Sequence, residues 1–387
     1  MNDTYISNAV RYVGVNDKTL DLFESQYKVP NGVTYNSYVI LDQKVAVMDT
    51  VDGRATDQWM TNLEQVLGDV SPDYLIVSHM EPDHGANIQR FAERYPLAKL
   101  VGNAKTFSMV SQFFELNLEG RTVEVKEGDT LELGEHTLQF FMAPMVHWPE
   151  VMVTYEQKEK ILFSADGFGK FGAMDAEEEW TEEAARYYLN IVGKYGVQVQ
   201  ALLKKAAALD ISVICPLHGP VLKENLEFYI GKYQTWSSYE PEEKGVLVAY
   251  ASIHGNTADG AKQLAELLKE QGETVEVLDL SRTDMSLAVR KAFYYDRMVL
   301  ACATYDGGLF PSMEEFLQHL KSKNFQKRKV GLMENGTWAP MAAKQMRAVL
   351  ETMKQVEVPE EIVTIRSAVH ADTVGQMKVL AQAMASH

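Results

Sequence analysis

The fold is decided by the stretch Asp73-Tyr-Leu-Ile-Val-Ser-His79-Met-Glu81-Pro-Asp83-His84-Gly85. Its apolar first half predicts a buried strand, and the four side chains able to bind metal follow closely after it. In an extended or turning loop, the alternating positions of His79, Glu81 and Asp83 can point these three donors in one direction. We expect Pro82 to prevent a regular helix through the segment, because proline lacks a backbone N–H. The stretch therefore predicts a metal site at the end of a strand.

Three other apolar runs end in a side chain that can bind metal. They are residues 137–146, 160–165 and 210–217, which lead into His147, Asp166 and His218, respectively. Functional side chains gather where strands end and loops leave the core. Any one of these residues alone is more often a loop or capping residue, so the prediction rests on the four strand ends together.

Composition limits the class of protein. The chain has 387 residues, of which 46% are hydrophobic and 24% are charged, as in a soluble protein with two or three domains. Its net charge of −17 makes nucleic acid and anionic membranes poor partners. The sequence lacks an apolar run of roughly 18 residues and a signal-peptide pattern, so we expect a cytoplasmic protein. Its two cysteines form no iron–sulfur motif, so redox chemistry would need an organic cofactor or a partner protein.

Strands and helices alternate through the first part of the chain. Residues 36–41 and 45–49 predict a β-hairpin across a short turn. Helices are expected at residues 57–67, 86–95, 105–114, 181–209 and 226–236. The polar segment 237–245, which contains proline and glycine, predicts a linker. We place the domain boundary there, between a first domain of residues 1–243 and a second of residues 244–387.

After the linker, buried strands alternate with amphipathic helices, which predicts a doubly wound parallel α/β domain. Its first strand-to-helix turn, Ser252-Ile-His254-Gly255-Asn256-Thr257, has the form of a flavodoxin phosphate loop, in which N–H groups and hydroxyls cradle an anion. Two later loops follow strands where such a fold binds its ligand. They are Thr304-Tyr305-Asp306-Gly307-Gly308 and Asn335-Gly336-Thr337-Trp338. Tyr305 and Trp338 can stack on an aromatic ring, so the sequence predicts a flavin site.

The pattern His79-x-Glu81-x-Asp83-His84, followed by His147, Asp166 and His218, resembles the metallo-β-lactamase superfamily. This resemblance implies an αβ/βα sandwich with a site for two metal ions at the edge of its sheets. Zinc hydrolases of the superfamily usually have histidine at the position of Glu81. Imidazoles and carboxylates without a thiolate suit iron or manganese better than structural zinc. The additional carboxylate also favours a site that changes its oxidation state.

The two halves in this order resemble the flavodiiron proteins, and the resemblance spans the whole chain. It includes residues 34–38, 143–149 and the stretch around 186–188. It implies that one iron binds His79, Glu81 and His147, and that the other binds Asp83, His84 and His218. Asp166 is implied to bridge the two ions, and the second domain is implied to bind FMN.

The resemblance also implies an activity and partners. The activity is reduction of dioxygen to water, of nitric oxide to nitrous oxide, or of both, with electrons passing through FMN to a non-haem diiron site. Because no cysteine-rich extension follows, we expect the two-domain class, which receives electrons from a separate rubredoxin or flavin reductase. A head-to-tail homodimer or a dimer of dimers is implied, in which each flavin faces the irons of the partner subunit.

Glu24, Trp148 and Tyr188 are the predicted catalytic side chains around the metals. Several family members have histidine at the position of Glu24, so this chain differs where a proton donor is expected. Tyr188 is either a phenol near the metals or a core residue. Trp148 and Phe168 are expected to form the dry wall of the pocket.

Two other functions fit parts of the sequence. One is a zinc hydrolase fused to a flavodoxin-like module, which Glu81 argues against and metal analysis would decide. The other is a flavin electron-transfer or sensor protein with a structural metal site, which would consume neither gas.

Overall fold

The computed structural model describes residues 5–385, which form two compact units. Within these residues, one unit comprises 5–188 and 197–234, and the other comprises 189–196 and 235–385. The main division thus falls earlier than the predicted boundary after Glu243. The reason is that the intervening segment bonds to the second unit: Arg328 donates to Tyr239 O (2.7 Å), and Arg290 pairs with Glu242 (2.6 Å).

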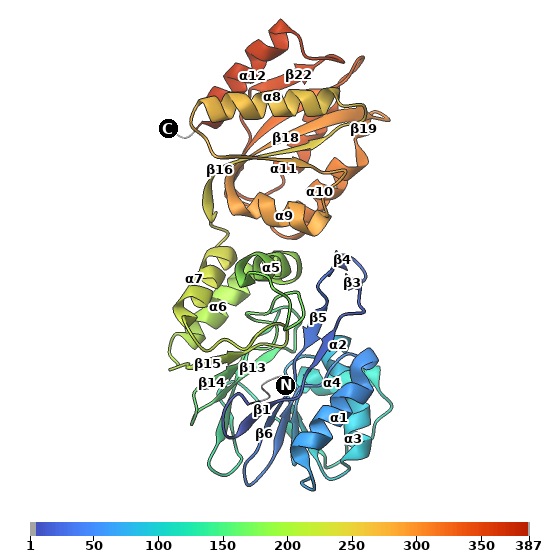
Figure 1. Cartoon of the computed structure of the whole chain (residues 1–387), viewed down its shortest axis with the longest axis vertical. Helices are drawn as coiled ribbons and strands as arrows, with labels where there is room; N and C mark the ends of the chain where they lie inside the picture. Colours follow the sequence, from blue (N-terminus) through green and yellow to red (C-terminus); the bar gives the residue numbers. More distant parts are fainter. Residues whose placement is uncertain (1–4, 386–387) are drawn as a thin grey trace. The chain divides into compact units, whose positions relative to one another are not determined.

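Two β-sheets form the centre of the first unit (Figure 1). The first sheet has the order β1 (Val10–Tyr12), β6 (Tyr38–Ile40), β7 (Ala46–Met48), β8 (Tyr74–Ile76), β9 (Lys99–Gly102) and β10 (Thr122–Glu124). The second has the order β11 (Thr130–Glu132), β12 (Thr137–Met142), β13 (Met152–Glu156), β14 (Ile161–Phe163) and β15 (Val213–Cys215). The predicted hairpin is confirmed as the antiparallel pair β6–β7.

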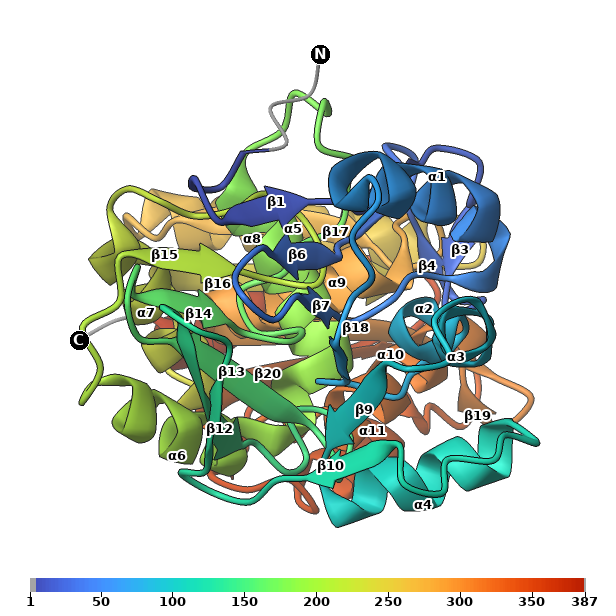
Figure 2. The same cartoon turned by 90° about the horizontal axis from the view of Figure 1, so that it is seen from below.

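The core of this unit lies between the two sheets. Ile76 and Val101 of the first sheet belong to the same buried cluster as Phe140 and Phe163 of the second. Figure 2 shows α1 (Thr56–Leu67), α3 (Ile88–Arg94) and α4 (Ala104–Phe113) on the side of the first sheet, with α6 (Gly196–Ala206) and α7 (Leu226–Ser237) on the side of the second. Every residue of β13 and β14 is buried, as expected for strands covered on both faces. This arrangement is the predicted αβ/βα sandwich.

The expectation for Pro82 is confirmed, because no regular helix runs through residues 79–85 and the only helical turn there begins at the proline. Proline occupies the first position of a single helical turn, α2 (Pro82–Gly85), where its missing N–H costs nothing. Asp83 and His84 therefore lie on this turn rather than in an extended loop. The next helix begins only at Ile88.

The single helix predicted over residues 181–209 is interrupted. α5 (Trp180–Tyr187) leads into a π-helical turn η2 (Tyr188–Val192) and a 3-10 turn η3 (Gly193–Tyr195) before α6 begins. The Tyr239 hydroxyl donates to Gly193 O (2.9 Å) and accepts from Gly196 N (3.1 Å), and so replaces regular helical partners. A Cβ on Gly196 would lie 2.4 Å from Ser237 O, so only glycine fits at this crossing.

A short antiparallel ribbon extends from the first unit beside the sandwich. β3 (Leu22–Phe23) pairs with β4 (Tyr27–Lys28), and Glu24 lies in the turn between them. A second small pair joins β2 (Val15–Asp17) to β5 (Val33–Tyr35). The ribbon matters because it carries Phe23 and Glu24 to the functional site.

The second unit is a parallel sheet with helices on both faces (Figure 1). The sheet has the order β17 (Val275–Asp279), β16 (Glu243–Ala251), β18 (Tyr295–Tyr305) and β20 (Arg328–Asn335), with β21 (Val356–Glu357) and β22 (Ile362–Ile365) both paired to β20. One face carries α8 (Asn256–Glu270) and α12 (Ala371–Met384), and the other carries α9 (Met285–Tyr294), α10 (Pro311–Ser322) and α11 (Ala342–Leu350). This is the flavodoxin-like strand order, whose ligand site lies where the connections reverse, between β16 and β18.

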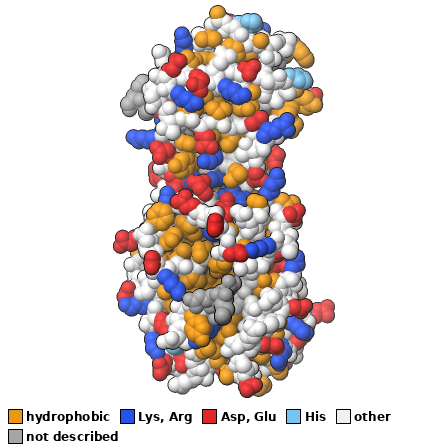
Figure 3. All heavy atoms as spheres, viewed as in Figure 1, with side chains coloured by type: hydrophobic (Ala, Val, Ile, Leu, Met, Phe, Trp, Pro, Cys, Tyr) orange, Lys and Arg blue, Asp and Glu red, His pale blue; other side chains and the backbone are white. Residues whose placement is uncertain are grey.

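The surface agrees with the composition. On the face drawn in Figure 3, acidic and basic side chains are interspersed over each unit rather than gathered into a broad basic area. Among residues 5–385, no helix is both long enough and apolar enough to cross a membrane.

Candidate metal and flavin sites

The seven predicted metal ligands meet at one edge of the sandwich, each just beyond the end of a strand. His79 and Glu81 follow β8, Asp83 and His84 lie on α2, His147 lies between β12 and β13, Asp166 follows β14, and His218 follows β15. Strand pairing explains why two of these ligands, Asp166 and His218, lie close together. β14 and β15 are parallel neighbours with Phe163 opposite Cys215, so Asp166 and His218 leave the sheet at equivalent positions.

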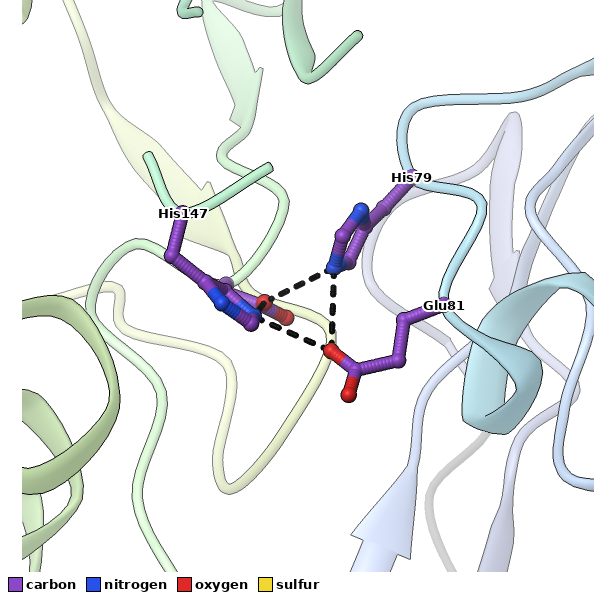
Figure 4. A group of neighbouring side chains, drawn as sticks. His79, Glu81 and His147 are labelled. Atoms are coloured by element: carbon purple, nitrogen blue, oxygen red, sulfur yellow. Dashed lines mark hydrogen bonds and ion pairs between the residues drawn. The ribbon is translucent and has the colours of Figure 1, made fainter. Parts of the chain in front are cut away.

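One group consists of His79, Glu81, His147 and Asp166. The Nε2 of His79 lies 3.2 Å from Glu81 Oε2 and 3.4 Å from Asp166 Oδ2. The Nε2 of His147 lies 3.0 Å and 3.1 Å from the same two oxygens. Figure 4 shows His79 and Glu81, from one segment, facing His147 from another, with their donor atoms turned toward a common point.

The other group consists of Asp83, His84 and His218. Asp83 Oδ2 lies 3.3 Å from the Nε2 of His84 and 3.2 Å from the Nε2 of His218, and the two nitrogens are 3.0 Å apart. Asp166 Oδ1 lies 3.5 Å from the first nitrogen and 3.8 Å from the second. Asp166 therefore turns one carboxylate oxygen toward each group.

The spacings of 3.0–3.4 Å within each group fit metal coordination, and those from Asp166 Oδ1 to His84 and His218 are slightly longer. Donor atoms held at about 2.1 Å around one tetrahedral or octahedral ion are roughly 3.0–3.4 Å apart. Within residues 5–385, both oxygens of Asp83, Oδ1 of Asp166 and Nε2 of His147 are buried without a well-formed hydrogen bond. Buried polar atoms normally have partners, so these atoms indicate that a bound cation completes the site. The donor set, nitrogen and carboxylate oxygen without sulfur, fits iron.

Protons and metal ions compete for the same histidine nitrogens. Burial disfavours a charged imidazole, but Asp166, Glu150 and Glu81 outweigh burial and raise the pKa of His79 well above its usual range. Burial would raise the pKa of Asp166, but His79 and His147 hold it well below its usual range. Metal binding must release the histidine protons, so the affinity for metal falls as the pH falls.

A second layer of residues orients the histidines. Glu150, fully buried, accepts from His79 Nδ1 (2.8 Å) and from Met80 N (2.8 Å), which leaves His79 Nε2 directed at the metal position. The Nδ1 of His218 donates to Thr34 O (2.6 Å). Asp49 accepts from Ser78 N (2.6 Å) and fixes the start of the ligand loop.

Glu150 and Asp49 were not predicted from the sequence. The sequence signal that identified the ligands, an apolar run that ends in a histidine or carboxylate, is also present at Asp49, which ends a predicted strand. Glu150 follows closely after His147, but the sequence does not reveal which histidine it contacts.

Aromatic rings enclose the histidines. The Trp148 ring stands perpendicular to that of His79, with centroids 5.3 Å apart, and Phe23 stands in the same way against His218 at 5.4 Å. Of the two interpretations of Tyr188, its burial and its contact with Tyr233 agree with a core residue. The ring centroid of its neighbour Tyr187 lies 5.5 Å from that of His218. The ring centroid of Tyr188 instead lies 5.0 Å from that of Tyr233. Adjacent helical residues point about 100° apart, so a helix presents only one of the two tyrosines to the histidine.

Glu24 lines an open cavity of about 290 Å³ that also reaches Glu81 and Asp83. Arg54 and Tyr35 form part of the same wall. The pKa of Glu24 is raised by desolvation and by the negative charge of Glu81. The structure thus places a carboxyl with a raised pKa in the cavity that leads to the metal ligands.

The predicted flavin loops gather around a cavity of about 720 Å³ at the ends of β16, β18 and β20. The predicted residues that line it are Ser252, His254, Asn256, Thr257, Thr304, Tyr305, Asp306, Gly307, Asn335, Gly336, Thr337 and Trp338. Gly255 and Gly308 do not line it, and Ile253, Ala303, Ala339, Met341 and Ser367 were not predicted.

The flavin cavity suits FMN. α8 begins at Asn256 without a side-chain cap, so its first N–H groups can bind a phosphate. Gly255 has φ +99°, and the space beside it is open. Tyr305 and Trp338 are 44% and 82% exposed, which leaves flat aromatic surfaces for a ring to stack on.

Comparisons with known proteins agree with this geometry. Residues 33–219 match the family described as ODP family beta lactamase, and residues 248–366 match the flavodoxin family. The rubredoxin-oxygen oxidoreductase of Megalodesulfovibrio gigas is 27% identical over 100% of this chain and 98% of its own length. The anaerobic nitric oxide reductase flavorubredoxin of Aliivibrio salmonicida is 28% identical over 86% of this chain and 69% of its own. The solved structure of rubredoxin oxygen:oxidoreductase from the anaerobe Desulfovibrio gigas has a TM-score of 0.92 and 26% identity, covering 98% of this chain and 97% of that chain.

Fold and site together define a metallo-β-lactamase-like dimetal domain followed by a flavodoxin-like domain. The chain belongs to the flavodiiron protein family, whose cofactors are FMN and two non-haem iron ions.

The contact between Glu150 and His79 generates a prediction. Glu150→Gln removes the charge behind the His79 imidazole, and we expect the affinity for iron to fall about 10–100-fold. Titration of the apoprotein with ferrous iron measures this loss. Glu124→Gln is the control, because Glu124 is exposed on β10. Equal affinities in the two variants would show that Glu150 has no influence on the metal.

Proposed function

We propose that this chain reduces dioxygen to water, nitric oxide to nitrous oxide, or both. The observation that carries the proposal is the position of Asp166, whose two oxygens face two separate groups of ligands. A shared carboxylate holds two metal positions side by side, close enough for both to act on one diatomic molecule or on two adjacent ones.

Iron held at these ligands would supply the redox chemistry for a diatomic gas, and FMN held in the cavity of the second unit would supply electron transfer. The chain's own residues supply positioning and protons. Glu150 holds His79 in one orientation, and Trp148 and Phe23 exclude water from the histidines. We assign Glu24 the role of proton source, because its carboxyl lines the open cavity that reaches Glu81 and Asp83, and burial and the charge of Glu81 raise its pKa.

Iron rather than zinc follows from the donor set. Glu81 makes a third carboxylate in the site, and its Oε2 lies within 3.2 Å of the nitrogens of His79 and His147. The extra negative charge offsets the positive charge that an iron pair gains on oxidation, which zinc never undergoes. A zinc hydrolase is therefore a poorer fit to this geometry.

The electron donor in this proposal is a rubredoxin or a flavin reductase, and the proposed location is the cytoplasm. A head-to-tail homodimer, alone or as a dimer of dimers, is proposed to bring each flavin to the irons of the partner subunit. In a two-fold dimer, the two electron transfers from flavin to the partner's irons are equivalent.

The activity is tested by stopped-flow mixing of the fully reduced protein with each gas separately. We expect about two iron ions and one FMN per chain, and flavin reoxidation on mixing with at least one gas. Isolation with chiefly zinc together with hydrolase activity would contradict the proposal. A protein that holds iron and FMN but consumes neither gas would favour a sensor or an electron-transfer protein.

Glu81→His tests the charge argument. We expect the variant to fold, to prefer zinc and to lose gas reduction, because the site has one fewer negative charge. Glu81→Asp is the control, since it shortens the side chain but keeps the charge, and it should keep the preference for iron. Metal analysis and gas consumption measure both effects. Full iron occupancy with unchanged turnover in Glu81→His would refute the charge argument.

The dimer is tested with two inactive chains. One carries Gly255→Asp and Thr257→Ala in the phosphate loop, and the other carries His79→Ala and Asp166→Ala at the metals. In a doubly tagged mixed dimer, transfer between subunits leaves one complete pair, so we expect about half of the wild-type gas consumption. If the mixed dimer consumes no gas although its flavin and metal occupancy are confirmed, electrons pass within one chain.

A further inference from the structure

The first unit contains an apolar cavity that shares no lining residue with the open cavity of Glu24. Its volume of about 30 Å³ exceeds the roughly 10–15 Å³ that one water-sized molecule occupies. Val153 and Leu162 of the second sheet line one side, and Val199 and Leu203 of α6 line the other. All four side chains are buried, so the cavity lies between the sheet and its covering helix.

The inner wall of this cavity is made by the loops that hold two metal ligands. Val146 immediately precedes His147, and Gly167 and Phe168 immediately follow Asp166. The cavity therefore adjoins the loops that carry His147 and Asp166.

The few polar groups in the lining are already bonded. Ser164 Oγ donates to Gly167 O (2.6 Å), and the Tyr233 hydroxyl accepts from Phe168 N (2.6 Å). Lys205 directs its Nζ to Glu127 and to Met142 O, both at 2.9 Å. A buried water needs two to four polar partners, so this cavity favours an apolar occupant.

One end of the cavity is lined by residues that reach the surface. Its lining includes Phe141, Leu202, Ala206 and Leu209, which are half-buried, whereas the residues next to the metal-ligand loops are fully buried. The lining thus runs from an accessible apolar rim to the backbone of the ligands.

We propose that this cavity is a binding site for the gaseous substrate, a small apolar diatomic molecule, beside the metal site. The proposal rests on the proposed function. Uncharged gases partition into apolar space, whereas protons need the polar groups of the Glu24 cavity. The two cavities give gas and protons separate approaches to the metal site. One lies beside His147 and Asp166, and the other lies at Glu81 and Asp83.

The first test uses xenon, an apolar atom that binds in dry cavities. Crystals of the holoprotein are pressurised with xenon, and we expect a xenon peak between α6 and the second sheet. Wild-type crystals without xenon in this cavity would overturn the proposal, and this test requires no variant.

The second test fills the cavity. Val199→Phe adds a ring to a lining residue, whereas Val197→Phe makes the same change at a 75% exposed position of α6 that does not line the cavity. We expect Val199→Phe to remove the xenon peak and to raise the KM for gas about threefold or more with little change in kcat, and Val197→Phe to do neither. If Val199→Phe does not fold with full iron and FMN, Leu202→Trp at the half-buried rim replaces it, with the same expected results.

A filled cavity with an unchanged KM for both gases would overturn the proposal while leaving the proposed function intact. A wild-type protein that holds iron and FMN but consumes neither gas would overturn the proposed function, and with it this site for substrate.

Discussion

The structure of the first unit depends on one shared carboxylate. Asp166 is almost fully buried and turns one oxygen toward His79 and His147 and the other toward His84 and His218. Three carboxylates lie in this small volume, and burying charges without partners is strongly unfavourable. Two cations held between them would convert this repulsion into attraction. The positions of the ligand loops at the edge of the sandwich would therefore depend on the bound cations.

The sandwich supplies the rigidity that such a site needs. Strand ends bring ligands that are far apart in the sequence to one edge, and parallel pairing of β14 and β15 sets Asp166 and His218 in register. Buried partners of the ligands, above all Glu150 behind His79 and Thr34 behind His218, then fix the direction of each imidazole. The flavodoxin-like unit is arranged in the same way, because the loops that line its cavity all follow the ends of parallel strands.

Much of this could be predicted from the sequence, because apolar runs that end in a histidine or aspartate mark both strands and ligands. The direction in which each side chain points could not be predicted. Tyr187 and Tyr188 are equivalent in the sequence, and only the helix shows that Tyr187 faces His218. The break after α5 depends on Tyr239, which lies far along the chain from the glycines that it contacts. The helical turn that begins at Pro82 was not predicted, because proline excludes a helix interior but is compatible with a helix start.

The central claim is that Asp166 bridges two iron ions, and anomalous X-ray scattering from crystals of the holoprotein tests it most directly. Data collected on either side of the iron absorption edge should show two peaks about 3.5 Å apart, one in each ligand group, with an Asp166 oxygen next to each. Both peaks should be strong above the iron edge and weak below it. A single peak, or peaks that appear instead at the zinc edge, would contradict this account of the site.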